Sequence, residues 1–234
     1  MRAFQYIGFD ADDTLWHSED GFERAKDRFL ELVQPHVADP SMVATELLKT
    51  ERRNLPTFGY GVRSFGLSMI ETAVLLSEGS VPAPVIGELV AMTREHLQEP
   101  VRVLPGVVDT LHTIAEHYPI MLITKGDLLH QTSKVASSGL ADLFTHIEIF
   151  LEKDDDTYRN AFRRLDVDPT RFCMVGNSVR SDILPVLSLG GQGVHLPYHL
   201  LWELEAHEAE HDPTSHERFV ALTSIEELPE WLGI

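Results

Sequence analysis

The chain has 234 residues, of which 43% are hydrophobic, and a formal net charge of −18 at pH 7, values typical of a soluble globular protein with one large domain or a domain carrying an insertion. The negative charge argues against a nucleic-acid partner, which requires a basic face, but leaves a small anionic substrate possible at a locally positive site. One cysteine, no signal-peptide pattern and no apolar run near the roughly 18 residues that span a bilayer predict a cytoplasmic protein without a membrane partner.

The chain begins with a short apolar run followed by a cluster of acids. Residues 4–9 (FQYIGF) are aromatic and apolar, which predicts a buried strand. Asp10, Asp12 and Asp13 follow this run directly. Carboxylates so close together raise one another's pKa unless a cation or hydrogen-bond donors compensate. We therefore expect compensating groups elsewhere in the chain.

Helical periodicity then extends from Ser18 to about residue 98. Ser18 and the Asp39-Pro40 pair are suitable helix starts, and residues 67–76 and 85–97 form apolar helical stretches. No alternating strand pattern is evident in this part. It is predicted to be a helical insertion.

After Pro100, short apolar runs alternate with helical segments. The predicted strands of this part are residues 120–124, 147–151, 172–176 and 193–196. Each of the first three is followed by a predicted helix: one through Lys134, one through Leu165 and one over residues 183–189. This alternation predicts an α/β fold with a parallel sheet covered by helices on both faces. We expect a core domain of residues 1–16 and 100–234, and a helical domain of residues 17–99.

Polar residues follow four of the predicted strands, at the edge where open parallel sheets bind ligands. In chain order they are Asp10 and Asp12, Thr124 and Lys125, Lys153, and Asn177 with Asp182. Each is weak evidence alone, because such residues are often caps or solvated side chains. Their recurrence at equivalent positions indicates a functional site.

This set suits phosphoryl transfer through a carboxyl phosphate. A carboxylate can attack phosphorus, but it repels the phosphate dianion, so a metal ion must bridge the two. A second carboxylate two residues further can protonate the leaving oxygen and then activate water, a contribution of roughly 10²–10⁴-fold. Lys153 would neutralise phosphoryl oxygens, and the Thr124 hydroxyl would orient them.

Four segments together resemble the haloacid dehalogenase (HAD) superfamily, in its phosphatase-like branch. They are FDADDTLW, IMLITKG, EKDDDTY and MVGNSVRSDI, which occur in the order of that superfamily's four motifs. The resemblance implies a Rossmann-like three-layer core and Mg²⁺ held by Asp10, Asp12 and Asp182. It also implies that Asp10 is the nucleophile and Asp12 the general acid/base. The predicted insertion matches the helical cap of such enzymes in position and character.

Three positions depart from the family's pattern. Asn177 stands where many relatives have Asp, which removes a negative charge but leaves an oxygen able to orient a metal-bound water. We expect Mg²⁺ binding to be retained. Asp13 stands where glycine is common, and is expected to face solvent, cap the turn or lie behind the metal ligands. Lys125 stands where relatives often have Asn, and would contact phosphate or offset local negative charge.

Among the functions of this superfamily, Asp12 favours phosphate-ester hydrolysis, because the related dehalogenases lack the second Asp and need no metal. We therefore expect a phosphatase acting on a small phosphorylated metabolite. A sugar-phosphate mutase and a non-catalytic ligand-binding relative stay open as alternatives. A phosphate-receiving signalling domain is disfavoured, because such domains are much shorter and have no place for the insertion.

Substrate selection is expected in the insertion. Residues 55–66 (LPTFGYGVRSFG) are rich in glycine and predict a shaped loop, and loops often carry binding residues. Tyr60 and Arg63 are the candidate specificity residues, with Arg63 contacting an anionic group other than the phosphate. The alternative is a structural connection between helices with solvated arginines, including Arg52 and Arg53.

The C-terminal part contains two histidine pairs with i,i+4 spacing. They are His195 with His199, and His207 with His211. Such pairs can bind a metal on a helix. Pro197 interrupts the first pair, and the acidic surroundings of the second favour a solvated helix face instead.

Overall fold

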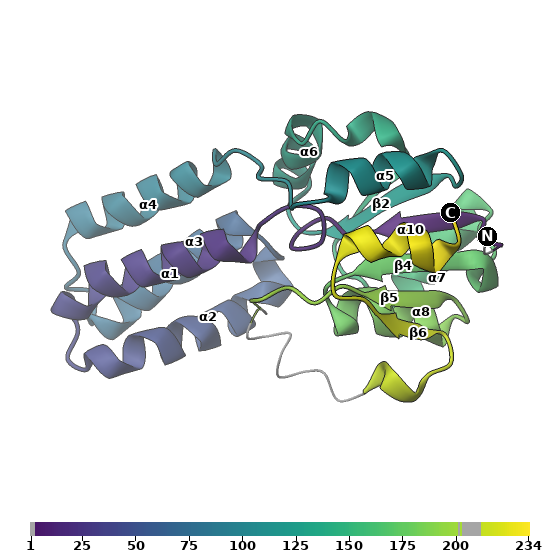
Figure 1. Ribbon diagram of the computed structural model, residues 1–234. Coiled ribbons are helices and arrows are strands. Elements are labelled where there is room, and N and C mark those ends of the chain that lie inside the picture. The colour runs from purple at the N-terminus through teal and green to yellow at the C-terminus, as the bar shows by residue number, and fades with distance from the viewer. Residues whose placement is uncertain (1–2, 201, 203–211) are drawn as a thin grey trace. The chain divides into compact units, whose positions relative to one another are not determined.

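The computed structural model describes residues 3–200, 202 and 212–234. The chain divides into two compact units. One combines Met1–Ser18 with Val101–Ile234 and is an α/β unit, and the other, Glu19–Pro100, is helical (Figure 1). Within the described residues, no helix has both the length and the apolar character needed to cross a membrane.

The α/β unit is built on one parallel sheet of six strands, in the order β3-β2-β1-β4-β5-β6. The strands are β1 (Tyr6–Phe9), β2 (Ile120–Lys125), β3 (Phe144–Phe150), β4 (Phe172–Gly176), β5 (Gln192–His195) and β6 (Phe219–Ala221). The predicted parallel sheet is confirmed. Strand β6 was not among the predicted strands, because it pairs with β5 over three residues, too few to give a periodic pattern.

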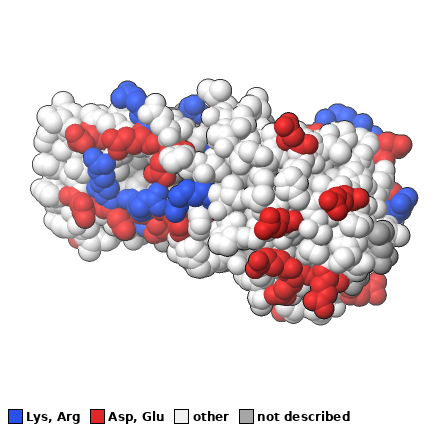
Figure 2. Space-filling view, turned by 45° about the horizontal axis from the view of Figure 1, so that its top comes forward, with Lys and Arg blue, Asp and Glu red and all other residues white. Residues whose placement is uncertain are grey.

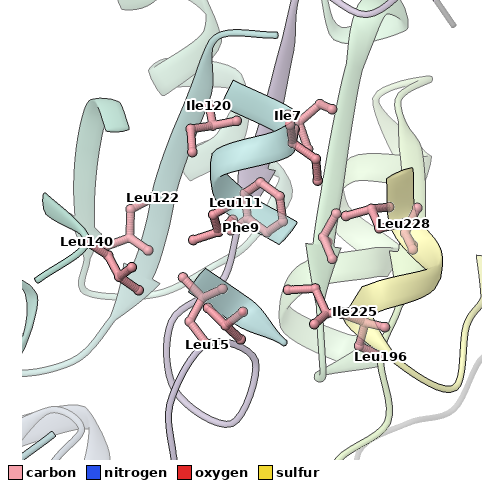
Figure 3. Packing of buried hydrophobic residues seen from close by; sticks show 14 of the residues in the cluster. Ile7, Phe9, Leu15, Leu111, Ile120, Leu122, Leu140, Leu196, Ile225 and Leu228 are labelled. Atoms are coloured by element: carbon pink, nitrogen blue, oxygen red, sulfur yellow. The ribbon is translucent and has the colours of Figure 1, made fainter. Parts of the chain in front are cut away.

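Alternate residues of the central strands face two separate cores, as the period of two along a strand requires. Ile7 and Phe9 of β1 pack on one face, while at Gly8 a Cβ atom would overlap the Phe172 ring on the other. The first face is covered by α5 (Val107–Ala115), α6 (Leu128–Ser137) and α10 (Leu228–Leu232), and the second by α7 (Asp155–Leu165) and α8 (Leu184–Ser188). Figure 3 shows side chains of strands and helices interdigitating in the first core, including Ile7 and Leu111. The predicted three-layer, Rossmann-like core is confirmed.

The helical unit has four helices and its own core. They are α1 (Glu19–Val33), α2 (Val43–Phe58), α3 (Val62–Leu76) and α4 (Ala83–Leu97). Phe29, Leu47 and Met69 are among its buried side chains. On its surface basic and acidic side chains are interspersed (Figure 2), and Arg28 pairs with Glu88 and Glu95 of α4. Such exposed pairs contribute at most about 1 kcal/mol each, so the core is what holds this unit together.

The prediction of a loop over residues 55–66 is wrong. Most of it is helical: α2 continues through Pro56 to Phe58, α3 begins at Val62, and only residues 59–61 connect them. Gly66 lies inside α3, where a Cβ atom would overlap the side chain of Thr93 in α4. That glycine therefore permits close helix packing rather than a turn, and Arg52 and Arg53 lie on α2 rather than in a loop.

Candidate active site

The predicted site residues converge where the strand order reverses. β1 is central, with β2 on one side and β4 on the other, and the sheet grows outward from there in both directions. Asp10 directly follows β1, where its N–H donates to the carbonyl of Val175 at 2.9 Å, and Asn177 directly follows β4. In open α/β sheets, ligands bind beyond the carboxyl ends of the strands at such a reversal.

A buried lysine joins two buried carboxylates at this position. Lys153 Nζ donates to Asp10 Oδ1 and, at 2.7 Å, to Asp182 Oδ1. Asp10, Lys153 and Asp182 expose only 6%, 4% and 1% of their surface. Burial raises the pKa of Asp10 to about 7, against the opposing charge of Lys153. Burial would lower the pKa of Lys153, but the two carboxylates raise it, so the lysine stays cationic beside Asp10.

Asp182 is held rigidly in the π-helical turn Val179–Ile183. Its Oδ2 accepts the Ser178 N–H at 2.9 Å, and its Oδ1 accepts Lys153. A Cβ atom at Gly176 would overlap the Asp182 carboxylate, so glycine is needed at the end of β4. Both oxygens of Asp182 therefore anchor protein groups, and its predicted function as a metal ligand stays a prediction.

Asp12 has a different set of partners from Asp10. Lys134 Nζ lies 2.5 and 2.8 Å from its two oxygens, Gln131 Nε2 donates at 2.8 Å and Trp16 Nε1 at 2.7 Å. Burial alone would raise the pKa of Asp12, but Lys134 and these hydrogen bonds outweigh it and lower the pKa. Asp12 is therefore an ionised, firmly held carboxylate.

The oxygens near Asp10 suit a hard cation such as Mg²⁺. The Thr14 hydroxyl oxygen lies 3.2 Å from Asp10 Oδ2 and 3.3 Å from Asn177 Oδ1, so it brings these two acceptors to one place. Among the described residues, no group of three or more His, Cys, Asp or Glu is arranged to hold a metal. Mg²⁺, however, is commonly bound through one or two carboxylates, waters and substrate phosphate. Asp10 and Asn177 fit such a site, whereas the Asp12 carboxylate is engaged by other side chains, and its predicted function as a metal ligand stays a prediction.

The structure distinguishes the alternatives left open for Asp13 and favours one for Lys125. Asp13 is buried with φ 62°, a left-handed conformation that glycine and Asp tolerate, and its Oδ1 accepts the Ser18 N–H at 2.8 Å. It therefore caps the turn rather than facing solvent. Lys125 donates to Ser181 Oγ at 2.8 Å and lies 3.6 Å from Glu152, which favours the offsetting of negative charge.

The other residues predicted for the site have no contact with Asp10 or Asp12 described above. Thr124, the predicted phosphate-binding hydroxyl, is buried at the carboxyl end of β2. Tyr60 and Arg63 belong to the helical unit, and their part in substrate selection stays a prediction. His195 Nε2 is 2.9 Å from the carbonyl oxygen of Asn177. The pair His207 and His211 lies outside the described residues.

Sequence reasoning gave no function to Thr14, Gln131 or Lys134, all of which contact a catalytic candidate. A signal was present for two of them. Gln131 and Lys134 are three residues apart in the helix that follows β2, and such residues share a helix face. A polar face directly after a strand whose end carries a site residue is a pattern that could have identified them.

The Asp154 side chain supports the segment that carries Lys153. It accepts the Thr157 N–H at 2.8 Å and so caps α7. Replacing Asp154 with Ala is expected to lower the free energy of unfolding by about 1 kcal/mol. Hydrogen bonds from Thr157 lower the pKa of Asp154, so its contribution is present above the ordinary value of 3.8 and is lost as the pH falls below it.

Urea unfolding of the variant and the wild type at about pH 7 and at the lowest pH where both fold would check this sign. The exposed Asp142, replaced in the same way, is the control. A difference between variant and wild type that grows as the pH falls would contradict the assignment.

Comparison with known proteins agrees with this geometry. A family model described as haloacid dehalogenase-like hydrolase matches residues 4–190. A haloacid dehalogenase-like family hydrolase from Xanthomonas campestris is 40% identical, with a TM-score of 0.87 over 99% of this chain and 91% of that one. Among curated proteins, none matches the chain.

Two more distant structures share the fold. A predicted phosphoglycolate phosphatase from Haemophilus somnus is 18% identical with a TM-score of 0.66, and covers 99% of each chain. A 2-haloacid dehalogenase from Pseudomonas syringae is 22% identical with a TM-score of 0.64, and covers 98% of each chain. The family match spans most of the sequence and includes every residue placed around Asp10 above. The chain therefore belongs to the haloacid dehalogenase-like hydrolases.

Proposed function

We propose that this hydrolase is a Mg²⁺-dependent phosphatase that acts on the phosphate monoester of a small metabolite. The observation that supports it most is the buried Asp10 carboxylate, ion-paired with Lys153 and followed two residues later by a second carboxylate. A buried cation beside the nucleophile offsets the repulsion between a carboxylate and a phosphate dianion.

In the proposed reaction, a carboxylate oxygen of Asp10 attacks phosphorus, and the bond from phosphorus to the leaving oxygen breaks. Asp12, which is ionised in the free protein, takes up a proton from solvent and gives it to that oxygen. As a carboxylate it then takes a proton from water, whose oxygen attacks phosphorus, releases phosphate and regenerates Asp10. Mg²⁺, held by Asp10, Asn177 and Asp12 with Asp182 behind them, would neutralise phosphoryl charge when bound.

The presence of Asp12 favours this reaction over dehalogenation. A halide leaves as a stable anion and needs no proton, whereas an alkoxide leaving group is a poor one without an acid. The test compares phosphate release from p-nitrophenyl phosphate and acetyl phosphate with chloride release from 2-chloropropionate. We expect phosphate release alone. Chloride release without phosphate release would contradict the proposal.

Removal of the metal is expected to stop the reaction without unfolding the protein. Treatment with EDTA should reduce phosphate release to background, and added Mg²⁺ should restore it, because the phosphate dianion otherwise meets the Asp10 carboxylate with only Lys153 in compensation. Circular dichroism of the EDTA-treated protein is the control for folding. Full activity in excess chelator would contradict metal dependence.

A further inference from the structure

The side chains that contact Asp12 include residues outside the family's four motifs. The inference drawn from them rests on the proposed function. We propose that Lys134 is a positioning residue, which with Gln131 holds the Asp12 carboxylate as the base that activates water for hydrolysis of the aspartyl phosphate. Lys134 lies 122 residues from Asp12 in the sequence and belongs to none of the four motif segments.

The geometry around Asp12 is built by rigid elements. Asp127 accepts the His130 N–H at 2.7 Å and starts α6 directly after β2. Gln131 and Lys134 then project from one face of α6 to the same carboxylate, while Trp16, with no exposed surface, donates to it from the segment after β1. Side chains fixed in this way hold a catalytic group without reorganisation during the reaction.

Gln131 also ties α6 to the carboxyl end of β2. Its Nε2 donates to the main-chain carbonyl of Lys125 at 2.9 Å as well as to Asp12. Gly126 has φ 136°, and a Cβ atom there would lie 3.1 Å from Gln131 Nε2, closer than an ordinary van der Waals contact. The turn after β2 is therefore shaped to let Gln131 reach Asp12.

Lys134 differs from the other two donors because it contacts both oxygens of Asp12. Trp16 and Lys134 occupy Oδ1, and Gln131 and Lys134 occupy Oδ2, which uses the four acceptor positions of a carboxylate. A shift of the ammonium onto one oxygen frees an acceptor position for a water proton while its charge stays beside the carboxylate. The indole and the amide keep the orientation fixed meanwhile.

Stability alone gives little reason for this pair. Apolar side chains of similar volume often stabilise a protein as well as a largely buried ion pair does, and the side chains of Lys134 and Asp12 are only 13% and 26% exposed. A lysine at this position beside a catalytic candidate is better explained by orientation of the carboxylate.

The test is pre-steady-state kinetics of Lys134→Met with p-nitrophenyl phosphate, whose leaving group departs without a proton. Attack by Asp10 should be preserved and breakdown of the aspartyl phosphate slowed. We expect a burst of nitrophenolate equal to the enzyme concentration, and kcat lower by about ten- to a hundredfold, a part of what a positioned base contributes. KM should fall in parallel, so kcat/KM should change by less than about threefold.

Lys134→Arg keeps a positive charge that can contact both Asp12 oxygens, so its kcat should lie between those of Lys134→Met and the wild type. Lys49→Met is the matched control, because Lys49 pairs with Glu46 on the exposed surface of α2. The Trp16 indole resonance in a ¹⁵N-labelled spectrum, assigned with Trp16→Phe, should move in Lys134→Met and stay in place in Lys49→Met.

Equal losses of kcat and kcat/KM, or wild-type kinetics in Lys134→Met, would overturn this inference while leaving an active wild-type phosphatase. If the wild type released phosphate from neither p-nitrophenyl phosphate nor acetyl phosphate, the proposed function would fail first, and the base role of Asp12 with it. The two failures are therefore distinguishable by the wild-type rate.

Discussion

Replacing Asp10 with Asn is expected to reduce phosphate release by at least about 10⁴-fold, because the neutral amide cannot form the covalent intermediate. The fold should survive, since Asn is nearly isosteric and Lys153 keeps its ion pair with Asp182. Phosphate release from p-nitrophenyl phosphate measures the first effect, and the thermal unfolding transition measures the second.

Asp142→Asn is the matched control for this change, because Asp142 is exposed in the same unit and contacts none of the groups around Asp10 described above. It should retain the wild-type rate. Substantial phosphate release from purified Asp10→Asn protein would show that Asp10 is not the nucleophile.

Replacing Lys153 with Met is expected to be the most destabilising single change at the site. The variant leaves Asp10 and Asp182 buried beside one another without their shared cation, and loss of one partner from such a buried group costs about 3–5 kcal/mol. Activity should be lost as well, because nothing then offsets the charge of the incoming phosphate.

The pH dependence of Lys153→Met provides a second check. Without the lysine, burial and the nearby Asp182 charge raise the pKa of Asp10 in the folded state unopposed, so the folded protein binds more protons than the unfolded one. The stability difference from wild type should therefore shrink as the pH falls. Urea unfolding at several pH values measures it, with Lys49→Met as the control, and a wild-type stability at neutral pH would contradict the account.

The fold could largely be predicted from the sequence because its signals are local. Short apolar runs ended at polar residues, and β4 has the bounds expected for it. Strand β6 was missed, because three residues, none of them fully buried, leave no periodic pattern. The helical connection was misjudged because a glycine that allows two helices to pack, Gly66 against Thr93, looks in sequence like a glycine that makes a turn.

The site was predictable only where position along a strand decides it. Asp10 and Lys153 were expected at one sheet edge, and the structure joins them. The orientation of Asp12 was not predictable, because it depends on Lys134 and Gln131, which reach it from a helix far along the chain. A side chain's direction depends on such tertiary contacts, which spacing alone does not encode.

The most direct test of the central claim is to find the covalent intermediate. Wild-type enzyme is mixed with p-nitrophenyl phosphate or acetyl phosphate and Mg²⁺, quenched with acid during turnover, and digested for peptide mass spectrometry. We expect a phosphoryl group on Asp10, absent from Asp10→Asn protein. Steady turnover with no phosphorylated peptide, or with the phosphoryl group on another residue, would contradict it.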